Sequence, residues 1–158
     1  YYTAGLVGNN DGTISNSYVT GTVSGSGNVG GLVGSNAARV SNSYVADGSQ
    51  ISGQDGVGGL IGHNYIWGGR VAVSNSHYNI DAVDINGGHF VTTGGVYGGQ
   101  FADWLNNGLA LDIAQYLGAA DGNGAYSISS AQGFKDLLGF ADGRYRFLMV
   151  GFMPGMPS

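Results

Sequence analysis

The sequence predicts an all-β protein, a parallel β-helix or solenoid with coils of about 26–28 residues, and three observations predict it. The first is an internal repeat. Closely similar words of the form Gly-Leu-Val/Ile-Gly begin at Gly5, Gly31 and Gly59, so successive copies are 26 and 28 residues apart. Periods between roughly 20 and 50 residues are typical of solenoids, propellers and other repeat arrays.

The second observation is the composition of each unit, in which short β-branched or aromatic runs end at Gly, Asn, Asp or Ser. Residues 28–34, 39–45 and 49–53 are examples, and such runs are typical of strands between tight turns. A helical repeat is excluded because glycine recurs every few residues and costs roughly 1 kcal/mol in a helix interior. A leucine-rich repeat needs several leucines in each unit, and the Ca²⁺-binding nonapeptide repeat needs Asp every nine residues, so both are excluded as well.

The third observation is that equivalent positions in the units hold equivalent side chains. Stacked coils bring such positions together, with strands about 4.8 Å apart, and we predict three short strands in each coil. Apolar ladders are then expected at Ile14, Val40 and Val73, at Val23 and Ile51, and at Val29 and Val57.

A Ser-Asn-Ser triplet follows the first of these ladders in all three units and places Asn16, Asn42 and Asn75 in one column. Side-chain amides stacked in this way donate hydrogen bonds to the neighbouring coil and satisfy backbone groups at a bend. The glycine columns mark corners with φ > 0 or a close approach of two backbones. Connections between parallel strands favour a right-handed coil. The pattern leaves open whether Leu32 or Val33 faces the core.

We expect the repeats to occupy residues 1–86, and a unit that links or caps the solenoid to occupy residues 87–158. The third repeat has an insertion between Asn64 and Val73 that holds Trp67. Insertions into a solenoid usually form a loop on one face.

Beyond the repeats, the sequence predicts strands or a hairpin over residues 77–100, followed by short helices. Glycine pairs at 87–88, 94–95 and 98–99 are the expected turns of that segment. Helix N-caps are expected at Asp103, at Asp112 and at either Ser129 or Ser130, and a strand is expected at Tyr126, Ser127 and Ile128.

Composition limits the possible functions. The 158-residue chain has a formal charge of −5, and only 9% of its residues are charged, so no basic stripe is present to bind nucleic acid. Without cysteine it has neither disulfides nor thiolate metal sites, and no apolar run is long enough to span a membrane. Because a repeat unit begins just after Tyr1, without a polar cap or signal peptide, we expect a fragment of a longer protein or a subunit that stacks on a partner.

Residues 5–36, GLVGNNDGTISNSYVTGTVSGSGNVGGLVGSN, closely resemble the GLUG-motif repeats of large bacterial exoproteins, notably filamentous-haemagglutinin-like adhesins and some surface peptidases. The resemblance covers residues 4–86 and implies a secreted or surface-anchored β-helix that serves as a stalk or a binding surface. The second half of the chain resembles the segments that join repeat blocks in such proteins. The run that follows Tyr145 departs from the acidic ending usual there.

An aromatic column is the first candidate site. Tyr18, Tyr44 and Tyr78, with Trp67 nearby, can form an outward ladder on which sugar rings stack. The same residues can equally be packed ladder residues that cover a glycine-rich surface.

Two other groups suggest metal or acid/base chemistry. His77, Asp81, Asp84 and His89 lie close together in the sequence, although the two aspartates flank a strand-like run and are expected to face water. Residues 121–124 weakly resemble a Ca²⁺ loop but lack its remaining ligands, so a turn is expected there.

The sequence therefore predicts a structural segment of a secreted bacterial surface adhesin or extracellular filament, without a cofactor or catalysis of its own. Its expected partners are the same protein or flanking repeats, stacked head to tail, and a host or matrix glycan. A carbohydrate-binding module is the alternative, and a β-helix glycan-degrading enzyme is the third hypothesis. An assembly surface is expected in the apolar run near the end of the chain, at Phe147, Leu148, Val150, Phe152 and Met153.

Overall fold

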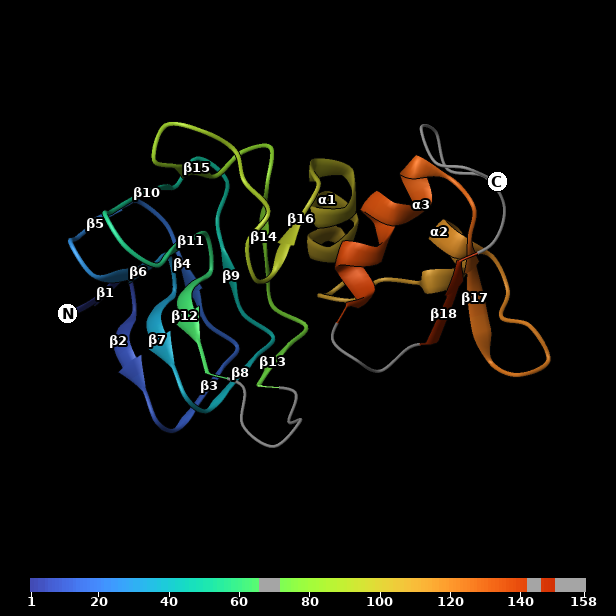
Figure 1. Ribbon diagram of the computed structural model, residues 1–158, viewed down its shortest axis with the longest axis horizontal. Helices are drawn as coiled ribbons and strands as arrows, with labels where there is room; N and C mark the ends of the chain where they lie inside the picture. Colours follow the sequence, from blue (N-terminus) through green and yellow to red (C-terminus); the bar gives the residue numbers. More distant parts are fainter. Residues whose placement is uncertain (66–71, 142–145, 150–158) are drawn as a thin grey trace.

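The computed structural model describes residues 1–65, 72–141 and 146–149, and most of its strands form three stacked coils (Figure 1). The first coil runs through β1 (Tyr2–Ala4), β2 (Val7–Asn10), β3 (Thr13–Ser15), β4 (Tyr18–Val19) and β5 (Thr22–Ser24). The second runs through β6 (Asn28–Gly30), β7 (Val33–Asn36), β8 (Arg39–Ser41), β9 (Tyr44–Val45) and β10 (Gln50–Ser52). The third runs through β11 (Val57–Gly58), β12 (Ile61–Asn64), β13 (Val73–Ser74), β14 (His77–Asn79) and β15 (Asp84–Ile85).

Each strand pairs in parallel with the equivalent strand of the next coil, which confirms the parallel β-solenoid. The five sheets are β1-β6-β11, β2-β7-β12, β3-β8-β13, β4-β9-β14-β16 and β5-β10-β15. The predicted ladders are in register, since Ile14 pairs with Val40 and Val40 with Val73. Val29 lies between Thr3 and Val57, and Ile51 between Val23 and Ile85.

Each coil has five short strands, so the prediction of three was wrong. The residues from Arg39 to Val45 read as one strand in the sequence, but the backbone turns at Asn42, where φ is 50°. Asn16 and Asn75 have the same left-handed conformation, with φ of 52° and 46°. Asparagine tolerates this conformation better than most residues, which explains its place in the middle of each triplet.

The core fills the inside of the coils. Its central residues, among them Val29, Val40 and Ile51, are fully buried. Leu32 and Val33 are both fully buried, so the choice between them that the sequence left open does not arise.

Glycine at the start of each Gly-Leu-Val/Ile-Gly word is required by close backbone approach. A Cβ on Gly31 would lie 2.2 Å from the carbonyl oxygen of Gly59 and 2.7 Å from Cγ2 of Val45. The Gly31 N–H donates to that same Gly59 oxygen at 3.1 Å, so the two coils are joined where they approach most closely. A side chain at this position would push the coils apart.

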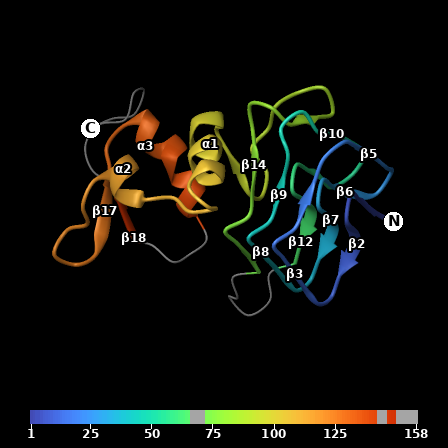
Figure 2. The same cartoon turned by 180° about the vertical axis from the view of Figure 1, so that it is seen from behind.

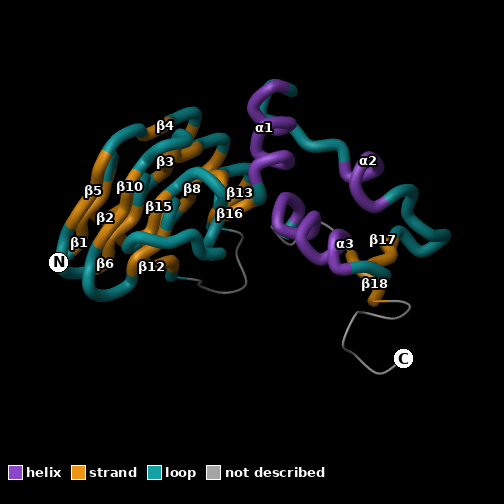
Figure 3. The backbone as a smooth tube through the Cα atoms, turned by 90° about the horizontal axis from the view of Figure 1, so that it is seen from above, coloured by secondary structure: helices purple, strands orange, loops and turns teal. Residues whose placement is uncertain are grey.

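Helices lie beyond the end of the stack that is opposite the N-terminus (Figures 2 and 3). The remaining elements are β16 (Gly95–Val96), α1 (Gly98–Asn106), α2 (Ile113–Leu117), β17 (Ala125–Ile128), α3 (Ala131–Asp136), the 3-10 helix η1 (Leu137–Phe140) and β18 (Arg146–Met149). Strand β16 pairs with β14 and begins a fourth layer, while β17 and β18 form a separate two-stranded parallel sheet.

Some of the predicted helix caps, strands and turns beyond the repeats are confirmed and others are not. Asp112 caps α2 through Ala114 N–H, Ser130 caps α3 through Gly133 N–H, and β17 includes the predicted strand. The prediction of an N-cap at Asp103 was wrong, because α1 begins at Gly98 and so includes the glycine pair that was expected to form a turn. Residues 77–100 contribute parallel strands, with a single antiparallel bridge between Ile85 and Gly88.

Candidate functional site

Columns of polar side chains join the coils, and one of them lies at the ends of β2, β7 and β12. Asn10 Nδ2 donates to Asn36 Oδ1 at 2.7 Å, and Asn36 Nδ2 donates to Asn64 Oδ1 at 2.8 Å. Asn36 is fully buried, and its side chain also bonds the backbone of Ala38. Asn10 and Asn36 therefore link neighbouring coils, and each closes a turn in its own coil. The equivalent positions of these asparagines in the three repeats are visible in the sequence, but their role in joining the coils was not predicted.

The Ser-Asn-Ser triplets form two further columns. In each triplet the second serine donates its hydroxyl to the carbonyl of the first, as Ser43 does to Ser41 at 2.8 Å. The hydroxyl of Ser43 also accepts the N–H of Ser17, and Ser76 accepts the N–H of Ser43, both at 3.1 Å. Every triplet therefore braces its own corner, and the second and third triplets also hold the preceding coil.

The asparagines of the triplets behave as predicted between the second and third coils, where Asn75 Nδ2 donates to Asn42 Oδ1 at 2.7 Å. Beyond the third coil, the indole N–H of Trp104 in α1 donates to Asn75 Oδ1, also at 2.7 Å. The amide column therefore ends on a tryptophan.

Comparison with known proteins finds a match for the first coil. The family model described as the GLUG motif matches residues 1–24, which form the first coil. The chain contains a GLUG motif. The second and third coils repeat the Gly-Leu-Val/Ile-Gly and Ser-Asn-Ser words of the first, so we call all three GLUG coils. GLUG motifs are found in bacterial extracellular and surface proteins. No curated protein and no solved structure matches the chain.

The aromatic column of the GLUG coils differs from the prediction. Tyr18 pairs with Tyr44, and their rings stack with centroids 5.2 Å apart and an interplanar angle of 11°. The third member is His77, which pairs with Tyr44, and not Tyr78. The register of the triplets could have shown this, because the residue that directly follows each Ser-Asn-Ser is Tyr18, Tyr44 and His77.

Tyr78 points into the core instead, so its predicted place in an outward ladder was wrong. It pairs with Val45 and is fully buried. Its hydroxyl donates to the carbonyl of Phe90 at 2.7 Å and lies 2.6 Å from the hydroxyl of Thr92. Burial raises the pKa of this phenol, and the hydrogen bonds with Thr92 offset only part of that effect.

Burial of Tyr78 predicts a loss of stability at alkaline pH. Above the ordinary tyrosine pKa of about 10, the unfolded chain releases this proton while the folded chain keeps it, so the free energy of unfolding falls as pH rises. Urea unfolding between pH 8 and pH 11 should therefore show a shallower decline for Tyr78→Phe than for the wild type. Tyr18→Phe, at an exposed position, is the matched control. Equal slopes for wild type and Tyr78→Phe would contradict the prediction.

Among the proposed ligand-binding residues that the structure describes, only Tyr18 presents a largely exposed ring, with 61% of its surface accessible. Tyr44 is half-buried because Phe101 and Trp104 of α1 pack edge-on against it, with centroids 6.2 and 6.0 Å from its ring. Trp67 lies outside the described residues. The structure therefore brings Tyr18 and Tyr44 together and places Tyr78 elsewhere.

The four residues that suggested metal or acid/base chemistry have separate structural roles. Asp81 Oδ2 accepts the N–H of Gly98 at 2.9 Å and so caps α1, while Asp84 Oδ1 accepts the N–H of Gly87 at 2.7 Å in a turn. His77 and His89 each place Nδ1 against a backbone carbonyl. Over residues 1–65, 72–141 and 146–149, no three His, Cys, Asp or Glu side chains gather into a possible metal site.

The segment at 121–124 forms the expected turn, in which Asp121 Oδ1 accepts the N–H groups of Asn123 and Ala125. A polar groove between α1 and α2 was not predicted. Asp103 lines it and accepts a hydrogen bond from the hydroxyl of Tyr116, whose pKa is raised by burial and by that carboxylate. Asp112, also on its rim, is the N-cap of α2, so both carboxylates of the groove have structural partners.

Two of the five residues of the predicted assembly surface are described. Phe147 and Leu148 lie in β18, where Phe147 is half-buried with its ring 6.4 Å from that of Tyr126, and Leu148 is 46% exposed. Val150, Phe152 and Met153 lie outside the described residues. No helix of the described chain is both long and apolar enough to cross a membrane.

Proposed function

We propose that the chain is a structural segment of a bacterial extracellular surface protein, an adhesin stalk or a surface filament, and that it has no catalysis of its own. One observation supports this above all: the residues that recur in every GLUG coil are used to join coils. Gly31 admits the neighbouring backbone, Asn36 links three coils and Ser43 braces a corner. The recurring glycine, asparagine and serine residues therefore serve to stack one coil on the next.

The mechanism of such a segment is additive. Each GLUG coil offers the next one strand edges, an apolar ladder and amide columns, so its length grows by about 4.8 Å with every coil added. Because each coil contacts only its neighbours, the number of coils sets both length and stability. The enzyme hypothesis needs acidic and basic side chains that converge in a groove, whereas the two aspartates between β14 and the end of β15, Asp81 and Asp84, act as a helix cap and in a turn.

Duplicating one coil tests this function. A chain in which residues 1–30 are followed by residues 5–158 repeats the 26-residue period of the first coil and keeps all of the connections. We expect it to fold, to be more stable in urea by about 1–3 kcal/mol, and to be longer by about one strand spacing in small-angle X-ray scattering.

A matched control inserts a Gly/Ser segment of equal length at the same point, which should form a loop and leave the free energy of unfolding nearly unchanged. If the duplicated coil also looped out, with rapid amide exchange across it, the GLUG coils would not be additive. The structural function would then be rejected.

A carbohydrate-binding module is the second candidate, favoured by the exposed Tyr18 ring stacked on Tyr44. It requires that the wild-type chain bind an oligosaccharide on a glycan array and that Tyr18→Ala lose this binding while its unfolding curve stays close to that of the wild type. Binding that survives in Tyr18→Ala, or no binding by the wild type, would exclude the module.

A further inference from the structure

The segment that follows the third GLUG coil occupies positions that a fourth coil would take. In the stack, the N–H of Gly5 donates to Gly31 O, and the N–H of Gly31 donates to Gly59 O. The N–H of Gly59 finds no such glycine beyond it and donates at 3.0 Å to the hydroxyl of Thr92. A side-chain oxygen therefore replaces the carbonyl of the missing coil.

Trp104 makes a second replacement. Between the second and third coils, the side-chain amide of Asn75 donates to Asn42 Oδ1. The next donor in that column would come from a fourth coil, but the indole N–H of Trp104 holds Asn75 Oδ1 at 2.7 Å. The Trp104 ring also packs edge-on against both His77 and Tyr44, with centroids 4.8 and 6.0 Å apart, so it covers the outer side of the aromatic column at this end of the stack.

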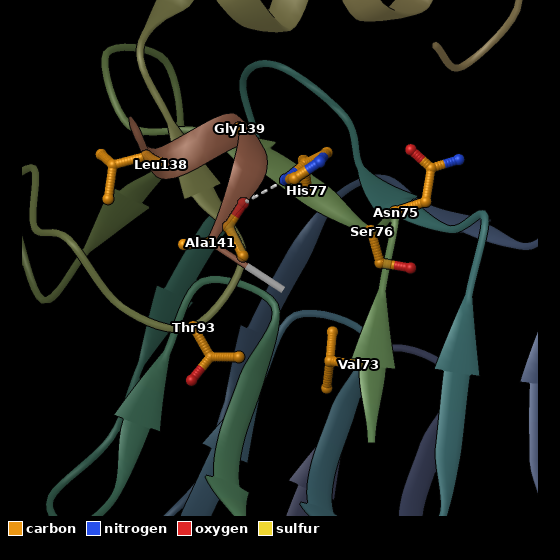
Figure 4. Close-up of a pocket in the computed structure, with 9 residues that line it drawn as sticks. Val73, Asn75, Ser76, His77, Thr93, Leu138, Gly139 and Ala141 are labelled. Atoms are coloured by element: carbon orange, nitrogen blue, oxygen red, sulfur yellow. Dashed lines mark hydrogen bonds between the residues drawn. The ribbon is translucent and has the colours of Figure 1, made fainter. Parts of the chain in front are cut away.

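Leu138 makes the third replacement. It belongs to η1, and its side chain packs against both the solenoid core and the small cluster of Val96, Phe101 and Trp104. Figure 4 shows η1 over the end of the third coil, facing Val73, Ser76 and His77. Strand β16 already pairs with β14 in the fourth layer, and the N–H of Tyr78 donates to Gly94 O there. Thr92, β16, α1 and η1 together form what we call the cap.

The cap fits less closely than a coil does. A cavity of about 100 Å³ remains between the third coil and η1, lined on one side by Val73 and on the other by Leu138. Within the cap, Gln100 of α1 donates to Asp136 O, but its buried Oε1 has no hydrogen-bond partner among the residues that the structure describes. Voids and unsatisfied polar atoms reduce the stability of a contact.

The opposite end of the stack has the complementary surface. Strands β1 to β5 are edge strands of the five solenoid sheets. Leu6 is 47% exposed, whereas its equivalents Leu32 and Leu60 are fully buried. Tyr18, whose ring is exposed, is the residue that would stack on His77 of another chain.

We propose that the cap is an intramolecular block on self-assembly, and that displacing it lets the third GLUG coil bind the first GLUG coil of a second copy, head to tail. The second copy is the occupant because it offers the contacts that already join coils within the chain, including Asn16 in place of Trp104 as the donor to Asn75. Such a contact is heterologous and does not close, so its product is a filament. This inference rests on the additive stacking of the proposed function.

Opening the cap in the full chain tests the proposal. Leu138→Asp places a charge against the core and should displace η1, while Leu148→Asp is the matched control at an exposed leucine on β18. Analytical ultracentrifugation should find the wild type and the control monomeric. Leu138→Asp should form concentration-dependent oligomers that appear as thin filaments in electron microscopy. Trp104→Phe, which removes the indole donor and part of the ring but leaves η1 in place, should form weaker oligomers than Leu138→Asp.

Two further measurements separate stacking from simple aggregation. Leu6→Lys, added to Leu138→Asp, should abolish the oligomers because it charges the first-coil surface that a second copy must present. Wild-type chain, added in small amounts to Leu138→Asp, should shorten the filaments, because it can add through its first coil but keeps its own third coil capped.

The proposal fails in either of two ways. Leu138→Asp can remain monomeric while rapid hydrogen exchange at Ser76 and Tyr78 shows that the third coil is uncovered. Alternatively, the double variant with Leu6→Lys can assemble as readily as Leu138→Asp alone. Neither outcome affects the coil-duplication experiment, so failure of the cap and failure of the structural function can be told apart.

Discussion

Replacing Gly31 by valine should destabilise the chain by about 3 kcal/mol or more, a large part of the roughly 5–15 kcal/mol that stabilises a typical domain. The new Cβ would lie 2.2 Å from Gly59 O and 2.7 Å from Val45 Cγ2, so both the second and the third coil must shift. That shift also breaks the hydrogen bond from Gly31 to Gly59. The midpoint of urea unfolding, followed by circular dichroism, measures the loss.

The control is Gly12→Ala. No atom lies within 4 Å of a Cβ built on Gly12, and its backbone is outside the left-handed region, so the midpoint should stay within about 0.5 kcal/mol of the wild type. A Gly31→Val chain as stable as this control would mean that the glycine column is not a packing requirement. The close approach of the second and third coils at Gly31 would then be refuted.

Much of the solenoid could be predicted because its physics repeats. Stacking brings equivalent residues together, so a ladder such as Ile14, Val40 and Val73 is already visible as a column when the repeats are aligned with one another. The caps of α2 and α3 could also be predicted, because an N-cap depends on a side chain and the backbone within one turn of it.

Other features depend on conformation that the residue types allow but do not require. Asn42 could have continued a strand, and only its φ of 50° divides the predicted strand into β8 and β9. Tyr78 was misplaced for a simpler reason. Its aromatic ring suggested a place in the column, but the residue that directly follows the third triplet is His77.

The cap could not be predicted because it does not repeat. Trp104 and Leu138 are 34 residues apart and look like ordinary apolar helix residues in the sequence. Their role appears only once the fold brings an indole N–H to Asn75 and a leucine side chain to the core. Replacements of this kind follow from tertiary geometry, and no spacing in the chain encodes them.

Replacing Asn36 by aspartate should cost about 3–5 kcal/mol at neutral pH, although the two side chains have nearly the same shape. Asn36 is fully buried, accepts from Asn10 Nδ2 and donates to Asn64 Oδ1. A carboxylate keeps the first bond, but it turns the second into a contact between two acceptor oxygens. It also buries a charge with no cation beside it in the column.

The pH dependence of this variant separates charge from shape. Burial favours the protonated form of a carboxyl introduced at position 36, so the deficit should shrink as pH falls toward about 4, where the unfolded chain also takes up the proton. A protonated carboxyl can again donate to Asn64. Gln54→Glu makes the same amide-to-carboxylate change at an exposed position and should show neither the cost nor its recovery. A deficit that persists unchanged in acid would point to distorted packing, and the amide column would then contribute shape to the stack but not directional hydrogen bonding.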